Sequence, residues 1–232
     1  MKIQERKYGE TARGYAYRML RDNIVSLDLE PGAPFNDMEF SRLIGVSRTP
    51  VREAVIQLSE ESRIIEIFPQ KGMRIALIDV ELVEEARSLR LLLEKAVAEQ
   101  ACDAAKPEDL ADLRENIKLQ SFYLEEGSPK KLLELDNEMH RKLFVLCRRE
   151  LTYNMCRRLA VHYDRIRSLS VHTIKDRTII EDHKKLIEAI ADGDKIRASA
   201  VMEKHLNRWQ PNEQKFREQY PRYFSDRSDP QF

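Results

Sequence analysis

Four side chains with metal-binding chemistry lie on three segments of helical periodicity in the second half of the 232-residue chain. Asp136 and His140 are spaced four residues apart, so on a helix both can reach one point. His183 lies in the middle of the apolar stripe of a second segment, and His205 lies in the stripe of a third. Burying one such polar group without a partner is costly, whereas three imidazoles and one carboxylate suit Zn²⁺, Ni²⁺, Co²⁺ or Mn²⁺. The pattern therefore predicts a divalent transition-metal site, with separate core histidines bonded to backbone carbonyls as the alternative.

Arg90 is a further polar residue on an apolar face, which it shares with Ala86, Leu93 and Val97. One interpretation is an ion pair within the helix to Glu94, four residues later. The other is a binding role, because a guanidinium beside a bound metal could hold a small carboxylate through two parallel hydrogen bonds. The residues alone leave both interpretations open.

The segment SRTPVR, from Ser47 to Arg52, carries side chains suited to nucleic acid. Arg48 and Arg52 share a helix face roughly opposite to the apolar stripe, and each could fork onto guanine O6 and N7. The hydroxyls of Ser47 and Thr49, with the free N–H groups of a helix start, suit phosphate oxygens. No acidic residue lies between Arg42 and Arg52, so this face is expected to carry a local charge of +3. The alternative is a pair of solvated arginines without a ligand.

These arginines need a helix-turn-helix to present them. A first helix is expected over about residues 11–27, and the prolines and glycine of LEPGAPF end it. A second begins after Asn36, a good cap, and ends at Gly45, which suits the left-handed residue after a helix. Ser47 is expected to cap the third helix with its side-chain oxygen. In the segment that follows, RIIEIFPQKGMRIAL, apolar residues alternate along the chain on both sides of a turn, which is typical of a β-hairpin. Residues 8–78 are therefore predicted to form a winged helix-turn-helix with a small β-hairpin wing.

Every segment from residue 79 to residue 209 predicts helix, so the expected fold class is mainly α. The predicted helices span residues 80–105, 107–126, 129–148, 150–170, 175–192 and 194–209. The metal-binding candidates lie on the third, fifth and sixth of them. The tail over residues 210–232 mixes prolines, charges and aromatics without a clear period, so its packing is not predicted.

Composition narrows the class of protein. The net charge is 0, so any nucleic-acid surface must come from local arrangement. Three scattered cysteines are too few for a disulfide framework or a Cys-rich zinc site, and they indicate reduced thiols in a cytoplasmic protein. No secretory signal and no run of about 18 apolar residues is present, so no membrane association is expected.

The run PGAPFNDMEFSRLIGVSRTPVREAVIQL resembles the DNA-binding domain of the GntR family of bacterial transcription regulators. That resemblance implies DNA contacts from the recognition helix and a wing tip that enters the minor groove. The residues implied are Ser47, Arg48, Thr49, Arg52 and, at the wing tip, Gly72.

Three later segments, LDNEMHRKLF, EDHKKLIEAIADGD and MEKHL, are similar to the FCD ligand-binding domain of the FadR-type branch of that family. Over about residues 80–209 this resemblance implies a bundle of six or seven helices. It implies that the metal ligands are Asp136, His140, His183 and His205. It also implies that Arg90 and Asn154 approach the effector cavity.

Together these features predict a ligand-responsive transcription regulator rather than an enzyme. A homodimer would place two recognition helices on a palindromic double-stranded operator, about one helical turn apart. A metabolite carboxylate at the metal would shift the equilibrium between dimer arrangements that fit or miss the operator, and repression without ligand is the commoner behaviour in the family. The alternatives are a metal-dependent enzyme fused to a DNA-binding domain, and a sensor of the metal itself. A catalytic metal needs a nearby general base, and no extra carboxylate is expected on the same inner stripes.

Overall fold

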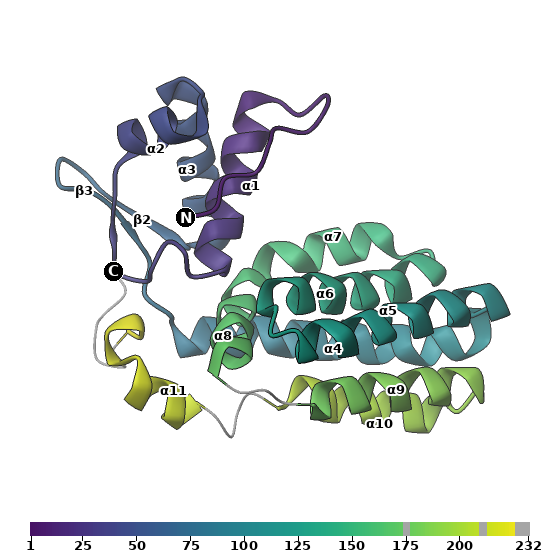
Figure 1. Cartoon of the computed structure of the whole chain (residues 1–232). Coiled ribbons are helices and arrows are strands. Elements are labelled where there is room, and N and C mark those ends of the chain that lie inside the picture. The colour runs from purple at the N-terminus through teal and green to yellow at the C-terminus, as the bar shows by residue number, and fades with distance from the viewer. Residues whose placement is uncertain (174–176, 209–212, 226–232) are drawn as a thin grey trace.

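The computed structural model describes residues 1–173, 177–208 and 213–225, and it is mainly α-helical, as predicted (Figure 1). The N-terminal domain contains α1 (Ala12–Val25), α2 (Asp37–Ile44) and α3 (Arg48–Ser62). In Figure 1 these helices stack at one side of a long helical bundle, and the wing extends away from them. In the described part of the chain, no helix combines the length and apolarity needed to cross a membrane.

Local capping explains where α2 begins and ends. The side-chain oxygen of Asn36 accepts hydrogen bonds from the N–H groups of Met38 (3.0 Å) and Glu39 (3.3 Å). Gly45 follows the helix with φ of 70°, a left-handed conformation that glycine adopts without strain. Because α3 begins only three residues later, the two helices form the predicted helix-turn-helix.

The start of α3 differs from the prediction. Ser47 occupies the N-cap position, but its side chain makes no capping hydrogen bond to any residue that the structure describes. An N-cap oxygen accepts from the second or third helical residue, and the third is Pro50, which has no N–H group. The Ser47 hydroxyl is exposed and therefore available to an external partner.

The wing is a three-stranded antiparallel sheet rather than a simple hairpin. The predicted hairpin is formed by β2 (Ile65–Phe68) and β3 (Gly72–Ile75), with Phe68 opposite Gly72. β1 (Pro34–Phe35) pairs with the other edge of β3. The sequence did not predict β1, because two residues are too few to show an alternating pattern.

The helical domain contains seven helices within the described residues, in agreement with the prediction of six or seven. They are α4 (Val80–Ala104), α5 (Pro107–Glu125), α6 (Pro129–Leu146), α7 (Glu150–Leu159), α8 (Val161–Thr173), α9 (Thr178–Ala191) and α10 (Lys195–Leu206). The prediction of one helix over residues 150–170 is wrong, since the chain turns at Ala160 between α7 and α8. Neither glycine nor proline marks this break. The turn places Val161, which is 1% exposed, in the apolar core of the N-terminal domain.

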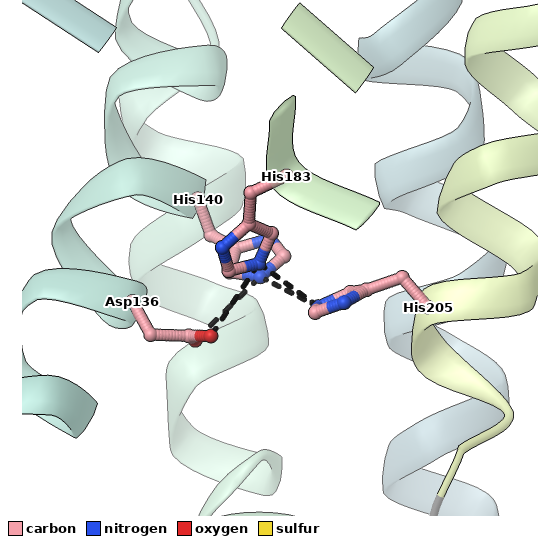
Figure 2. Close-up of side chains that lie close together, drawn as sticks. All are labelled: Asp136, His140, His183 and His205. Atoms are coloured by element: carbon pink, nitrogen blue, oxygen red, sulfur yellow. Dashed lines mark hydrogen bonds and ion pairs between the residues drawn. The ribbon is translucent and has the colours of Figure 1, made fainter. Parts of the chain in front are cut away.

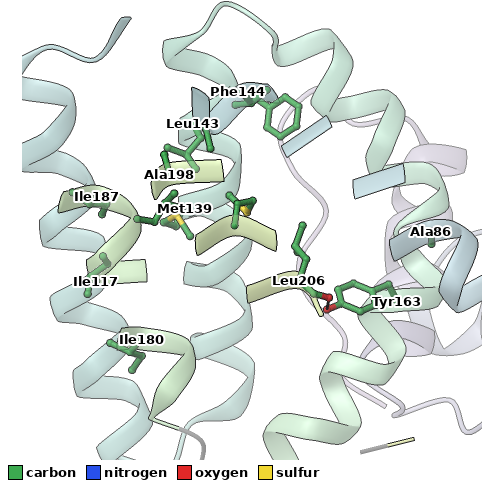
Figure 3. Packing of buried hydrophobic residues seen from close by; sticks show 14 of the residues in the cluster. Ala86, Ile117, Met139, Leu143, Phe144, Tyr163, Ile180, Ile187, Ala198 and Leu206 are labelled. Carbon is green, nitrogen blue, oxygen red and sulfur yellow. Dashed lines mark hydrogen bonds between the residues drawn. The ribbon is translucent and has the colours of Figure 1, made fainter. Parts of the chain in front are cut away.

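The apolar core of the helical domain fixes the helices that carry the candidate ligands (Figure 3). Met139 and Leu143 of α6 are almost fully buried in it, together with Ile187 of α9 and Ala198 of α10. The polar residues of α6 at positions 136 and 140 flank Met139 on the same inner side. Their directions are therefore set by close packing rather than by solvent.

α8 joins the two domains through polar contacts to the N-terminal backbone. The Nε2 atom of His162 lies 2.5 Å from the carbonyl oxygen of Ser62 at the end of α3. Arg165, which is fully buried, donates to the carbonyl oxygens of Ala76 (2.6 Å) and Leu77 (3.3 Å) in the linker. These bonds hold the N-terminal domain against one side of α8.

The C-terminal tail packs onto the same linker. α11 (Glu213–Gln219) and a short 3-10 turn (Pro221–Tyr223) lead to a parallel bridge between Phe224 and Ile78. The N–H group of Ile78 donates to the carbonyl oxygen of Tyr223 at 2.7 Å. Residues 209–212 and 226–232, which include part of the predicted tail, lie outside the described residues.

Replacing a tail phenylalanine should show how much this packing contributes to stability. Phe216 of α11 is fully buried in the core of the helical domain, so Phe216→Ala is expected to lower the free energy of unfolding by about 3–5 kcal/mol. Phe122→Ala is the control, because Phe122 is 53% exposed and its loss should cost about 1 kcal/mol or less. Urea denaturation measures both values. Equal effects would mean that α11 adds nothing to the folded core.

Candidate metal centre and DNA-binding surface

The four predicted metal ligands converge inside the helical domain (Figure 2). Asp136 and His140 come from α6, His183 from α9 and His205 from α10, and their ligand atoms all lie within 4.8 Å of one another. The Nε2 atom of His205 is 3.2 Å from that of His140 and 3.4 Å from that of His183. The carboxylate of Asp136 lies 3.5 Å from the Nε2 atom of His183 and 3.6 Å from that of His140.

These separations fit a single metal ion. Ligand atoms about 2.0–2.1 Å from zinc at tetrahedral angles are about 3.4 Å apart, which matches the observed spacing. The alternative of separate core histidines requires each ring to have its own backbone carbonyl. Instead, the Nε2 atoms of three rings and one carboxylate face a common point. The donor set suits the divalent metals that the sequence predicted.

Contacts at the other ring nitrogens direct two of the imidazoles. The Nδ1 atom of His183 lies 2.9 Å from Oε1 of Gln120, whose amide nitrogen donates to Asn116 at 2.7 Å. The Nδ1 atom of His140 lies 2.5 Å from Oε2 of Glu94. The acceptor at Nδ1 of His183 favours the proton there, so its Nε2 atom presents a lone pair toward the centre. A cation at that point would satisfy this lone pair.

Glu94 corrects the expectation that no further carboxylate lies near the site. It is 4% exposed, and its oxygens contact Nε of Arg90 (2.7 Å) and the ring of His140. Burial alone would raise the pKa of Glu94, but the charge of Arg90 lowers it below its usual range. Since one oxygen bonds to Arg90 and the other lies against the His140 ring, Glu94 is placed to orient a ligand rather than to serve as a free base. Its position four residues after Arg90 on a buried face was the available sequence signal.

Arg167 of α8 was also missed, and it holds the only carboxylate of the ligand cluster. Its guanidinium bonds to Asp136 and, at 2.8 Å, to Asp164. Burial alone would raise the pKa of Asp136, but the charge of Arg167 lowers it well below the usual range. Asp136 is therefore ionised in the folded protein, as metal ligation requires.

The buried histidines give a testable dependence on pH. Burial lowers the pKa of His183 to about 4 and that of His205 well below its ordinary value, whereas unfolded histidines bind protons below about pH 6.5. The unfolded state therefore binds more protons in this window, so the free energy of unfolding of metal-free protein must fall as the pH falls from about 6.5 to about 4. His183 alone should account for about 3 kcal/mol of that fall.

Urea denaturation of chelator-treated protein across the same pH window measures this fall. The His183→Gln variant should show a shallower dependence on pH than the unchanged chain. An equal dependence would contradict a lowered pKa at His183.

Arg90 combines features of both interpretations. The predicted ion pair with Glu94 is present at 2.7 Å, and the guanidinium carbon lies 5.2 Å from the centre of the Tyr163 ring. Arg90 is 4% exposed, and its buried Nη1 atom has no hydrogen-bond partner among the described residues. Buried donors are almost always satisfied, so this N–H group fits a ligand acceptor.

Asn154 is not brought to the ligand cluster. It lies on the exposed face of α7, whereas Cys156 and Ala160 of the same segment are buried. Asn154 instead lines a cavity at the domain junction, beside Tyr17 of α1 and Gln57 of α3. Its contact with an effector at the metal centre, which the resemblance implied, stays a prediction.

Asp37 corrects the charge expected on the DNA-binding surface. This residue lies in the first turn of α2, and its Oδ2 atom accepts from Nε of Arg48 (2.8 Å) and from Nε of Arg52 (2.6 Å). The side chain of Asp37 is 3% exposed, whereas those of the two arginines are 49% and 58% exposed. The predicted local charge of +3 omitted this carboxylate because it comes from a neighbouring helix.

The remaining DNA-binding candidates lie on exposed backbone. Ser47 and Thr49 are exposed at the start of α3. Gly72 is exposed at the wing tip, and a Cβ atom there would meet nothing within 4 Å. Its φ of 107° is the reason for glycine, since residues with a side chain rarely adopt that conformation.

The N-terminal domain is a winged helix-turn-helix with an exposed arginine pair, and it is joined to a helical domain with a buried ligand cluster. This combination defines a class of two-domain DNA-binding regulators. Family models support this class: the gntR family of bacterial regulatory proteins matches residues 13–75, and the FCD domain matches residues 85–208. The chain therefore belongs to the GntR family and is a transcriptional regulator with an FCD domain, not an enzyme.

Individual relatives agree with this assignment. The chain is 30% identical over 202 residues to an uncharacterized HTH-type transcriptional regulator in an unstable DNA locus of Streptomyces ambofaciens, covering 85% of this chain and 83% of that protein. It is 28% identical over 211 residues to the HTH-type transcriptional repressor RspR of Escherichia coli K12, covering 90% and 92%. The solved structure of E. coli McbR/YncC has the same fold, with a TM-score of 0.77, 20% identity and coverage of 90% and 99%.

Proposed function

We propose that this regulator binds a palindromic operator as a homodimer and that a small carboxylate, held at a metal in the helical domain, controls its affinity for DNA. The observation that carries the proposal is the convergence of one carboxylate and three imidazoles on one buried point. Repression in the absence of the carboxylate is the mode of action proposed.

The charge balance around the cluster supports an anionic effector. Three buried carboxylates face three guanidinium groups, so the site is close to neutral without a metal. These groups are Glu94, Asp136, Asp164, Arg90, Arg157 and Arg167. A divalent ion adds two positive charges, and each carboxylate group of a bound ligand would offset one of them in a site shielded from water.

Arg90 supports a carboxylate rather than an uncharged ligand. Its Nη1 atom is a buried donor without a partner in the described residues, and its charge acts on both Asp136 and His205. When bound, the metal would supply Lewis acidity that fixes one carboxylate oxygen. Arg90 would then donate to the same carboxylate and fix its orientation.

The link to DNA binding runs through α8. One side of this helix holds the ligand Asp136 through Arg167, and the other side holds the N-terminal backbone through His162 and Arg165. A carboxylate that changes the charge around Asp136 would favour one arrangement of α8 over another. The helix would pass this preference to the spacing of the two recognition helices.

The test is a titration of metal-loaded protein, bound to its operator, with a panel of small carboxylic acids. One or more acids should release the DNA, and Arg90→Gln should weaken that response at least about tenfold while metal content stays unchanged. Arg114→Gln, an exposed arginine on α5, is the matched control. An unchanged response in Arg90→Gln would remove Arg90 from the site. Release by metal alone would favour the metal-sensor alternative, and turnover of the acid would favour the enzyme alternative.

A further inference from the structure

A cavity of about 380 Å³ lies at the junction of the two domains, separate from the metal centre. Residues of α1 and α3 line one side of it, and residues of α7 line the other; Figure 1 shows where these helices lie in the fold. The lining residues are Tyr17, Arg18, Arg21, Asp22, Gln57, Glu61, Asn154, Arg157 and Arg158. Four arginines therefore face two carboxylates.

Two of these arginines are poorly neutralised. Arg18 is well paired with Glu10, outside the cavity, at 2.7 Å. Arg21, in contrast, reaches the carboxylate of its neighbour Asp22 only at 3.5 Å. Arg158 reaches Glu61 at 3.8 Å.

Glu61 cannot compensate fully, because other donors share it. Its Oε2 atom accepts from the hydroxyl of Tyr17 at 3.0 Å, and its Oε1 atom accepts from the amide of Gln57 at 2.9 Å. Burial lowers the pKa of Arg21, and the charge of Arg157 lowers it further. Asp164 offsets Arg157 at 2.6 Å, so the cavity is close to neutral overall, and its least neutralised guanidinium groups are those of Arg21 and Arg158, whose carboxylate partners are 3.5 and 3.8 Å away.

We propose that this cavity binds a small phosphorylated molecule, whose phosphate is held by Arg21, Arg157 and Arg158. Guanidinium groups match phosphate oxygens in geometry, and several of them together suit a dianion. The volume exceeds that of a phosphate alone and lies within the range of small-molecule sites. Tyr17, Gln57 and Asn154 would contact the organic part.

The cavity does not belong to the DNA-binding surface described above. Arg48 and Arg52 lie at the start of α3, whereas Gln57 and Glu61 lie near its end. Nine to thirteen residues of helix separate Arg48 from the cavity, or roughly 14–20 Å. A phosphate in the cavity is therefore distinct from the operator backbone read by the start of α3.

The site has a physical connection to the metal centre. Arg157 contacts Asp164 at 2.6 Å, Asp164 also contacts Arg167 at 2.8 Å, and Arg167 bonds to Asp136. A phosphate that attracts Arg157 toward the cavity would weaken the ion pair between Arg157 and Asp164. Arg167 would then pair more strongly with Asp164. The phosphorylated ligand and the metal centre are thus expected to influence each other, although the site itself does not require the metal.

Isothermal titration calorimetry on the full chain tests the proposal, with inorganic phosphate and ribose 5-phosphate as probes in chloride buffer of matched ionic strength. Both should bind, the ester more tightly. The Arg21→Gln/Arg158→Gln variant should bind at least about tenfold more weakly. Arg114→Gln removes an equal charge from an exposed site and should change nothing. No binding of either probe to the unchanged chain would overturn the proposal.

Two further variants distinguish phosphate binding in this cavity from phosphate binding at the metal centre. Asn154→Asp adds a negative charge to the cavity at an exposed position that folding does not depend on, so it should also weaken both probes. His183→Ala, in the metal cluster, should retain phosphate binding. If His183→Ala lost phosphate binding while the cavity variants kept it, the phosphate would be bound at the metal, and the proposal would be wrong. If no carboxylic acid released the DNA, the phosphate binding expected here would be unaffected.

Discussion

His183→Ala is expected to remove nearly all bound metal, while the unchanged chain purifies with close to one ion per protomer. His183 is fully buried, and its Nε2 atom faces the other ligands at 3.4 and 3.5 Å. Loss of an outer partner of a metal ligand alone weakens affinity about 10–100-fold, so loss of the ligand itself should weaken it by more than about 100-fold. Elemental analysis after dialysis without chelator measures the occupancy.

His162→Ala is the matched control for this prediction. His162 is also a buried histidine whose pKa burial lowers to about 4, but its ring bonds to the carbonyl oxygen of Ser62 at the domain junction. This variant should keep its metal. Gln120→Ala, which removes the partner of the His183 ring, should lie between the two, about 10–100-fold weaker. Full occupancy in His183→Ala would show that the ligand assignment is wrong.

The candidate metal ligands could be predicted because each one interrupts a helical apolar stripe. Periodicity alone places Asp136 and His140 inward on one helix, and it places His183 and His205 inward on two others. A core has limited room, so polar residues from several inner faces are expected to meet. The structure brings these four together, as the sequence predicted.

The surrounding partners could not be predicted in the same way. Glu94, Gln120 and Arg167 each contact a ligand from a different helix. Which residue of one helix faces which residue of another depends on crossing angle and axial offset, and neither is encoded in a single periodic pattern.

The charge of the DNA-binding surface illustrates the same limit. Counting residues from Arg42 to Arg52 gave no acid, and along the chain that count is correct. The helix-turn-helix, however, brings Asp37 from the start of α2 against both Arg48 and Arg52. The local charge depends on which residues folding brings together on the surface. Here an acid outside the segment holds the two arginines in place.

Arg52→Ala is expected to weaken binding to the operator by about 1–3 kcal/mol while leaving metal content unchanged. If Arg52 reads a base edge, binding to the operator should weaken more than binding to a random duplex. Fluorescence anisotropy with an operator obtained by selection, and with a scrambled duplex of the same length, measures both. Arg114→Ala controls for the lost charge.

Asp37→Asn distinguishes base reading from simple charge. The hydrogen bond from Arg48 lowers the pKa of Asp37, so its carboxylate is ionised at neutral pH and lies beside the expected position of DNA phosphates. Removing that charge should strengthen binding to the scrambled duplex and steepen its dependence on salt. It should also reduce the preference for the operator, because Arg48 and Arg52 lose the carboxylate that orients them. If Asp37→Asn instead strengthens both duplexes equally, Asp37 contributes only charge, and the orientation of the arginines must come from the DNA itself.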